Sequence, residues 1–273
     1  LIEDFIPMIE TRDEEATYDK IYKQVDNYNF FDPRKNAYVD VYARSIRGRI
    51  LDAGCGEGAH LKRMLGNKIE AFGIELSGVC CQKYLTDLPH RNVDIVTHVT
   101  SGTTYDGLIC MDVLEHISPA ELEDNLKALR RLSPSVFLGI ANHSDVQGGM
   151  ELHHIQENSG WWLKRLGSHF SRCTLVKEFP FPKEEPNFFL IECENETSAV
   201  SEPIPYSDGS VDQLVSSFCS ASNGMLSMMV DLEFELQELA TQNRGLAAEL
   251  GRLSNLRIVR LERFAKRCFS RGS

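Results

Sequence analysis

The chain has 273 residues, and 42% of them are hydrophobic, which suits one medium-sized domain with a substantial core and a further segment. The formal net charge of -11 argues against broad binding to nucleic acid, and no run of about 20 apolar residues predicts a transmembrane span. The eight cysteines show no C-x-x-C metal-ligand spacing, so we expect buried free thiols in a reducing compartment.

Residues 1–45 are polar and rich in tyrosine, and we predict one or two helices there, as an N-terminal segment or lid. Between residues 46 and 195, short apolar runs alternate with helical patterns. Strands are expected at Ile50–Ala53, Ala71–Ile74, Val93–Val96, Gly107–Met111, Val136–Ile140, Cys173–Lys177 and Phe188–Glu192, and helices at Ala59–Leu65, Val79–Leu85, Ala120–Leu132 and Ser159–Leu166. Such alternation predicts an α/β fold, a Rossmann-like parallel sheet with helices on both faces and a possible terminal hairpin.

The stretch ILDAGCGEGAHL places three glycines, Gly54, Gly56 and Gly58, between an expected strand and an expected helix. Glycine lets a ligand approach the backbone closely, and a helix N-terminus favours a carboxylate or phosphate. Glu75 follows 21 residues after Gly54, where its carboxylate can accept hydrogen bonds from ribose hydroxyls. The pattern therefore predicts a nucleoside-containing cofactor. Ala59 also completes a dinucleotide fingerprint, and a plain tight turn is the remaining alternative.

Residues 196–210 hold two prolines and no periodicity, and we interpret them as a linker. Residues 211–256 carry a heptad pattern with leucine every seven residues and a polar Asn243 at an a position, which favours a parallel two-stranded coiled coil or a higher oligomer. The seam residues that we expect to hold copies of the chain together are Leu232, Leu239, Asn243, Leu246 and Leu253. The alternative is one amphipathic helix that packs on its own domain.

The end of the chain is basic, in contrast to the rest. From Arg252 onward it has seven Lys and Arg against one acid, Glu262, so this segment is +6 and the remainder is -17. Basic residues alternate with apolar ones over residues 257–273, which is typical of an amphipathic helix on an anionic membrane surface. An RNA-binding tail is the less favoured alternative.

Three segments, LDAGCGEG, GIELS and YDGLICMDVLEHI, resemble class I S-adenosylmethionine-dependent methyltransferases, and the resemblance covers about residues 46–195. It implies S-adenosylmethionine as cofactor and a seven-stranded sheet whose last strand is antiparallel. It further implies that Asp52 and the glycine loop contact the methionine part, that Glu75 binds the ribose, and that the residues around Asp112 line the methyl-transfer site. No acidic residue follows the third strand to meet adenine, so Asp94 and His98 are the candidates. The implied cofactor-binding residues are Asp52, Gly54, Cys55, Gly56, Gly58, Glu75, Leu76, Asp94, His98, Asp112 and Val113.

A hydroxyl or amine acceptor must lose a proton during methyl transfer, and neutral histidine is a suitable base. The candidate catalytic residues are His116, His143, His153 and His154. His116 belongs to the family's DVLEHI segment, where it is often structural, and a phosphate acceptor would need no base. The spacing of His143, Asp145 and His153 matches no recognised metal-ligand pattern, so no metal is predicted.

The segments NHSD and LHHIQENSGWWLKRLG are similar to methyltransferases of bacterial surface-polysaccharide synthesis. In that reading Trp161 and Trp162 cover a sugar face, although core packing would also explain them. The layout with a coiled coil resembles chain-terminating methyltransferases of O-antigen synthesis. It implies methylation of a sugar hydroxyl on a lipid-linked glycan, at the cytoplasmic face of the membrane and beside a glycosyltransferase. The alternatives are a methyltransferase for a quinone or natural product, and an inactive scaffold.

Overall fold

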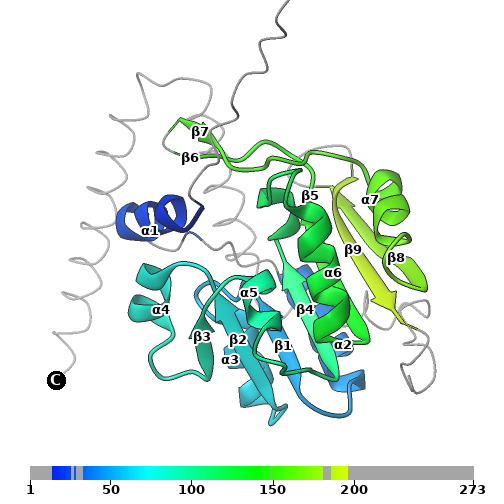
Figure 1. Ribbon diagram of the computed structural model, residues 1–273, viewed down its shortest axis with the longest axis horizontal. Coiled ribbons are helices and arrows are strands. Elements are labelled where there is room, and N and C mark those ends of the chain that lie inside the picture. Colours follow the sequence, from blue (N-terminus) through cyan, green and yellow to red (C-terminus); the bar gives the residue numbers. More distant parts are fainter. Residues whose placement is uncertain (1–13, 26–27, 29–32, 148, 181–185, 196–273) are drawn as a thin grey trace, which may run out of the picture. The chain divides into compact units, whose positions relative to one another are not determined.

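The computed structural model describes residues 14–25, 28, 33–147, 149–180 and 186–195. A seven-stranded sheet with the order β3-β2-β1-β4-β5-β9-β8 forms its centre (Figure 1). The strands are β1 (Ile50–Ala53), β2 (Ala71–Glu75), β3 (His90–Asn92), β4 (Gly107–Met111), β5 (Ser135–Ala141), β8 (Arg172–Pro180) and β9 (Pro186–Glu194). Strands β1 to β5 run parallel, and β9 is antiparallel to both of its neighbours. The predicted Rossmann-like sheet with an antiparallel last strand is confirmed, and β8 and β9 form the terminal hairpin.

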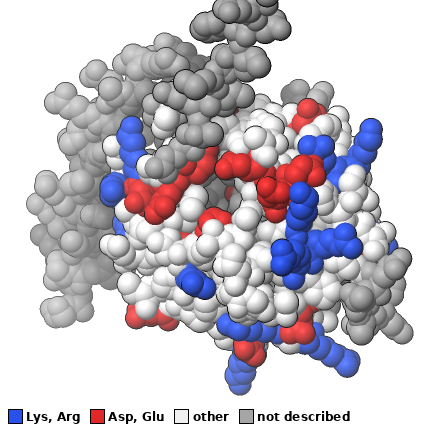
Figure 2. All heavy atoms as spheres, viewed as in Figure 1, with Lys and Arg blue, Asp and Glu red and all other residues white. Residues whose placement is uncertain are grey.

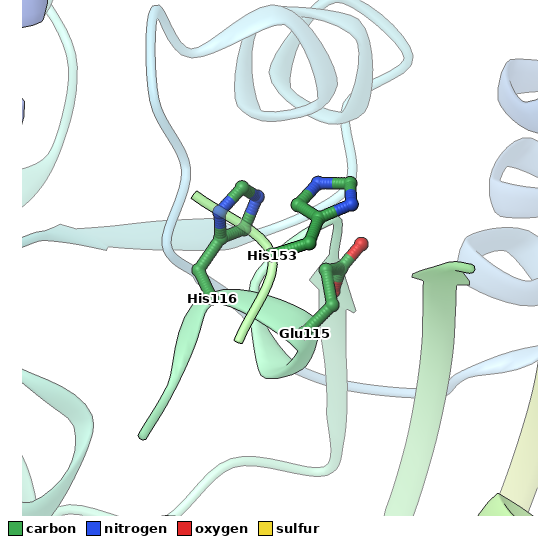
Figure 3. Close-up of side chains that lie close together, drawn as sticks. All are labelled: Glu115, His116 and His153. Carbon is green, nitrogen blue, oxygen red and sulfur yellow. The ribbon is translucent and has the colours of Figure 1, made fainter. Parts of the chain in front are cut away.

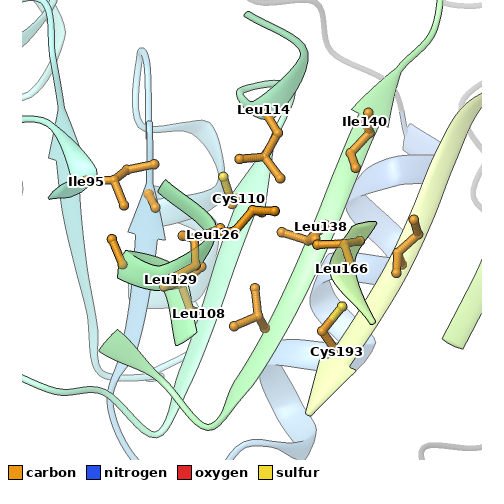
Figure 4. Close-up of a cluster of buried hydrophobic side chains, with 14 of the residues drawn as sticks. Ile95, Leu108, Cys110, Leu114, Leu126, Leu129, Leu138, Ile140, Leu166 and Cys193 are labelled. Carbon is orange, nitrogen blue, oxygen red and sulfur yellow. The ribbon is translucent and has the colours of Figure 1, made fainter. Parts of the chain in front are cut away.

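Helices cover both faces of the sheet. They are α1 (Glu14–Gln24), α2 (Pro33–Ser45), α3 (Ala59–Gly66), α4 (Gly78–Tyr84), α5 (Ile95–Val99), η1 (Leu114–His116), α6 (Leu122–Leu132) and α7 (Ser159–Leu166). Leucines of α6 recur at helical spacing and pack with α5 and α7 on one face, as Figure 4 shows for Leu126 and Leu129. Helices α2 and α3 cover the other face. Central strands β1, β4 and β5 are buried throughout, as expected for parallel strands covered on two sides.

The sheet reverses its strand order at β1, which has β2 on one side and β4 on the other. In open α/β sheets ligands bind at such a point, outside the carboxyl ends of the strands. Helix α1 lies beyond this edge (Figure 1) and is attached to α4, because Asp19 accepts hydrogen bonds from Ser77 Oγ at 2.7 Å and from the Val79 N–H at 3.1 Å. The N-terminal helices therefore border the candidate cofactor edge.

The prediction of a third strand at Val93–Val96 is wrong. The strand is β3, His90–Asn92, and the next residues begin helix α5. The Asp94 carboxylate accepts a hydrogen bond from the Thr97 N–H at 2.7 Å, so Asp94 is the N-cap of α5. The capping hydrogen bond of Asp94 thus favours a helix for the short apolar run that follows it, where the sequence pattern had predicted a strand. A two-stranded pair, β6 (Val146–Gln147) with β7 (Met150–Glu151), was also not predicted.

The predicted linker, coiled coil and basic tail all lie within residues 196–273, outside the described residues. The same holds for the seam residues Leu232, Leu239, Asn243, Leu246 and Leu253. Among the helices of the described ranges, none combines the length and apolar character that a membrane crossing would need.

Candidate active site

The glycine loop adopts a backbone conformation that only glycine tolerates well. Gly54, Gly56 and Gly58 have φ values of 73°, 50° and 76°. The loop is fixed to the neighbouring strand, because the N–H groups of Gly54 and Cys55 both donate to the Ile74 carbonyl at 2.9 Å. A Cβ on Gly54 would lie 2.5 Å from Val113 Cγ2, so the segment after β4 covers the loop closely. The two segments with the strongest family resemblance are therefore neighbours in space.

Glu75 joins the loop to the end of β2. Its side chain is buried, with Oε2 accepting from the Gly56 N–H at 2.9 Å and Oε1 from the Ser77 N–H at 2.8 Å. Burial raises the pKa of this carboxyl above its usual value, and the two backbone hydrogen bonds oppose that shift. Each carboxylate oxygen has two acceptor sites, so Glu75 can hold the loop and still accept from ribose hydroxyls.

Asp52 lies in β1 below the glycine loop and is 1% exposed. Within the described part of the chain its Oδ2 has no hydrogen-bond partner. Burial, and then the neighbouring charge of Glu75, raise the pKa of Asp52 to about 7. Leaving a buried carboxylate oxygen without a partner is costly, and a cationic amino group or a hydrogen-bond donor of a ligand would relieve that cost. The residues around the loop thus fit a ligand with a ribose and an amino acid part.

We expect Asp52→Asn to raise thermal stability at pH 8 in the absence of cofactor. Because the folded-state pKa is raised from 3.8 to about 7, the stability contributed by this group falls as the pH rises through that window. Asparagine carries no charge, so the gain over the unaltered protein should be small at pH 4 and largest above pH 7. Thermal unfolding at both pH values tests this, with the exposed Asp87→Asn as control. An equal effect at both pH values would contradict it.

Asp112 follows β4 with a φ of 53°, an unusual conformation for a residue other than glycine. Its carboxylate forms a salt bridge with Lys35 of α2, at 3.1 and 2.9 Å, and the Lys35 ammonium lies 4.0 Å from the centre of the Phe188 ring. Helix α2 thereby anchors the turn that leads into Val113. Backbone strain of this kind is common at functional sites and is maintained by surrounding contacts.

Two of the candidate histidines lie side by side beyond β4. The ring centres of His116 and His153 are 4.5 Å apart (Figure 3). His116 Nδ1 is 3.2 Å from the Leu152 carbonyl oxygen, and His153 Nδ1 is 2.6 Å from the His143 carbonyl oxygen. A carbonyl only accepts, so Nδ1 carries the hydrogen in both rings and Nε2 keeps the lone pair when the ring is neutral.

The surroundings favour the neutral form of both rings. Burial, followed by the neighbouring His153, lowers the pKa of His116 to about 3, and burial lowers the pKa of His153. Tyr18 of α1 contacts the edge of His116, with the ring centres 5.8 Å apart. Helix α1 therefore covers part of this pair.

The other two histidines hold the segment in place. His143 follows β5, and its ring centre is 4.9 Å from that of His153. His154 Nε2 lies 3.1 Å from the carboxylate of Glu14 in α1. The predicted candidates His116, His143 and His153 are thus brought together, whereas His154 links its segment to helix α1.

The adenine candidates are placed differently from one another. Asp94 follows β3 and caps α5. His98 is a correction: it is 3% exposed, stacks near Phe72 and lies 3.0 Å from the Tyr105 hydroxyl. Tyr105 precedes β4, so His98 belongs to the opposite end of the sheet from the glycine loop. Burial lowers its pKa, which agrees with a core histidine.

The remaining predicted cofactor residues lie along the loop edge. Cys55 is buried, and Leu76 follows Glu75 with its carbonyl 2.7 Å from Asn92 Nδ2. Trp162 is fully buried in the core, as the alternative interpretation stated, and Trp161 is half-buried.

Several residues of the site were not predicted from sequence. Lys35 reaches Asp112 from 77 positions away, and Tyr28 donates to Asp145 Oδ2 at 3.2 Å. His60 lies within the electrostatic reach of Asp112, and burial lowers its pKa to about 4. Among these residues, only Glu115 could have been predicted from the local sequence, because it precedes His116 in the DVLEHI segment. The others come from segments whose meeting depends on the tertiary fold.

The fold and this edge define a Rossmann-like protein for a nucleoside-containing cofactor. A model of the methyltransferase domain family matches residues 23–179, so the chain belongs to that family. It is a class I S-adenosylmethionine-dependent methyltransferase, with S-adenosylmethionine as its cofactor.

Similar solved structures share this fold at low sequence identity. The chain is similar to a Burkholderia thailandensis 1,6-didemethyltoxoflavin N1-methyltransferase, with 17% identity, a TM-score of 0.50, and coverage of 67% of this chain and 87% of that one. The magnesium protoporphyrin IX methyltransferase of Synechocystis PCC 6803 shows 17% identity, a TM-score of 0.49, and coverage of 68% and 99%. The N-terminal domain of EvdMO1 shows 16% identity and a TM-score of 0.48, with coverage of 67% of this chain and 96% of that one. No sequence among curated proteins matches the chain.

Proposed function

We propose that this methyltransferase acts on a hydroxyl group, and that its acceptor is a sugar of a lipid-linked bacterial surface glycan. The observation that carries the first part is the contact between His116, which is half-buried just beyond Asp112 and Val113, and the buried His153, both with lowered pKa values. When bound, S-adenosylmethionine supplies a methyl group on a positively charged sulfur, so transfer requires mainly an aligned nucleophile. A hydroxyl needs help to lose its proton, and these histidines provide it.

Each residue of the edge has a task in this proposal. Glu75 holds the ribose, and Asp52 accepts from the amino group of the methionine part. The glycine loop lets the cofactor lie against the backbone, and Val113 encloses it from the side of β4. The Nε2 atoms of His116 and His153 are the basic atoms that we assign to the acceptor, and their fixed Nδ1–H groups hold the rings in position.

A cavity next to His154, between the start of α6 and α7, has room for one sugar ring. Its volume is about 220 Å³, and its lining includes His154, Trp161 and Arg165. This is smaller than the roughly 300–1,000 Å³ typical of pockets for drug-sized ligands, and it suits one ring. Both side chains line the cavity, and the Arg165 guanidinium lies over one face of the Trp161 ring, 5.5 Å from its centre.

The membrane part of the proposal predicts that deletion of residues 256–273 abolishes co-sedimentation with vesicles that contain anionic phospholipid. Each Lys or Arg near an anionic surface contributes about 1 kcal/mol, and a coiled-coil dimer would present two such segments. Binding of the full chain should weaken as salt rises. Sedimentation that the deletion leaves unchanged would contradict a membrane role for this segment.

The acceptor is tested by transfer of labelled methyl from S-adenosylmethionine into fractions of a lysate from the source cells. We expect label in the lipid-linked glycan fraction, and none with a Glu75→Gln control. Label confined to small molecules would replace the sugar by a metabolite acceptor. Absence of transfer in every fraction, with intact cofactor binding, would contradict the enzymatic proposal.

A further inference from the structure

Glu115, His116 and His153 form a cluster of ligand-type atoms beyond the carboxyl end of β4 (Figure 3). One such atom of each residue lies within 4.8 Å of those of the other two. Glu115 and His116 come from η1, and His153 comes from the segment after β7. This set differs from His143, Asp145 and His153, whose spacing in the sequence matches no recognised metal-ligand pattern.

Glu115 is the unusual member of the cluster. Its side chain is fully buried, and Oε1 accepts from the Ala141 N–H at 2.7 Å. Within the described ranges, Oε2 has no hydrogen-bond partner. Leaving a buried carboxylate oxygen unpaired is costly, unless a cation or a proton occupies it. The hydrogen bond from Ala141 uses only Oε1, so Oε2 is left to face a ligand.

Both histidines have the hydrogen-bond arrangement of metal ligands. Each donates its Nδ1–H to a backbone carbonyl, Leu152 for His116 and His143 for His153, which fixes the tautomer and leaves Nε2 as a lone-pair donor. Histidines that bind metals usually have a carbonyl or carboxylate on the other ring nitrogen. The electrostatic surroundings also favour a cation, because acidic side chains gather on the face of the molecule where α1 lies (Figure 2).

We propose that Glu115, His116 and His153 bind a divalent transition-metal ion that activates the acceptor hydroxyl. Two imidazoles and one carboxylate suit zinc and its neighbours better than Mg²⁺ or Ca²⁺, which prefer oxygen ligands. With metal–nitrogen distances of about 2.0–2.1 Å, tetrahedral ligands are roughly 3.3 Å apart, so ligand atoms separated by up to 4.8 Å would have to approach one another by about 1.5 Å on binding. Three protein ligands leave a position open for the acceptor oxygen.

The role of the ion in activating the acceptor depends on the function proposed above, methyl transfer to a hydroxyl group. It would lower the pKa of the bound hydroxyl, whose proton passes to water. The oxygen then forms a bond to the methyl carbon while the carbon–sulfur bond breaks, and the sulfur keeps the electron pair. In this arrangement His116 and His153 hold the ion, and the ion takes the place of the direct base role given to the two histidines above.

Metal binding is measured on the full chain after removal of metal with a chelator. Titration with Zn²⁺, followed by heat, and with Co²⁺, followed by visible absorption, should each show one ion per chain. We expect Glu115→Gln and His116→Asn to weaken Zn²⁺ binding about a hundredfold or more, since even outer partners of metal ligands contribute 10–100-fold. His169→Gln, which alters a histidine paired with Glu123, is the matched control and should bind normally.

The affinity for S-adenosylhomocysteine separates this inference from the proposed function. Metal binding that is absent from the unaltered protein, or that the two variants leave unchanged, would overturn the metal site. If the variants do not fold, the Co²⁺ spectrum of the unaltered protein decides: nitrogen and oxygen ligands support the site, and thiolate charge-transfer bands overturn it. If the unaltered protein does not bind S-adenosylhomocysteine, the cofactor site on which the proposed function depends is refuted instead.

Discussion

Glu75→Gln is expected to weaken S-adenosylhomocysteine binding about a hundredfold. Both carboxylate oxygens accept from backbone N–H groups, so an amide nitrogen at either position would face a donor at Gly56 or Ser77. The variant also loses the charge that accepts from ribose hydroxyls. Hydrogen bonds to charged groups contribute about 1.5–3 kcal/mol each, and a total near 3 kcal/mol corresponds to about two orders of magnitude in Kd. Calorimetric titration measures it.

The control is Glu70→Gln, immediately before the same strand. The Glu70 side chain is 75% exposed, and its carboxylate lies 3.7 Å from Arg49, so its contribution to the fold should be small. We expect its cofactor affinity to equal that of the unaltered protein. An unchanged affinity for Glu75→Gln as well would show that the ribose lies elsewhere.

Gly54→Ala should abolish measurable cofactor binding and lower the melting temperature. The new Cβ would lie 2.5 Å from Val113 Cγ2, and alanine at a φ of 73° adds about 1–2 kcal/mol of backbone strain. Relief of the clash would move the segment after β4 away from the loop, and this movement would open the enclosure that Val113 forms. Cofactor titration and thermal unfolding report the two effects separately.

Two further variants identify the cause. Adding Val113→Ala removes the clash but not the backbone strain, so the double variant should recover part of the lost stability. Gly66→Ala, at the end of α3, meets no atom within 4 Å and has no positive φ, so it should leave binding intact and stabilise the helix slightly. Failure of the double variant to regain any stability would assign the whole effect to the backbone.

The proposals on the acceptor and the metal place the same residues in related roles. A histidine base and a metal ion are alternative ways to remove the hydroxyl proton, and dependence of turnover on the ion distinguishes them. In both, Lys35 and Asp112 fix the turn between the cofactor loop and the histidine pair. Helix α1 completes the surroundings through Tyr18, which contacts His116, and Glu14, which contacts His154.

Local sequence determined the central elements and the cofactor loop. Strands β1 and β4 and helix α7 were predicted with the same bounds, because apolar runs between turn signals leave few alternatives. The glycines and Glu75 were recognised because loop conformation and strand-end position are encoded within about 25 residues. The third strand was missed because one capping contact, Asp94 to Thr97, outweighed a short apolar run.

Only the tertiary structure decided which distant residues meet. The Lys35–Asp112 salt bridge, the Tyr28–Asp145 hydrogen bond and the approach of Glu115 to His153 each join separate segments. His98 shows the converse, since its residue type suggested a ligand contact, whereas the fold buries it at the other end of the sheet. Spacing along the chain fixes neighbours within one element, but long-range packing at the carboxyl edge determines which side chains share a site.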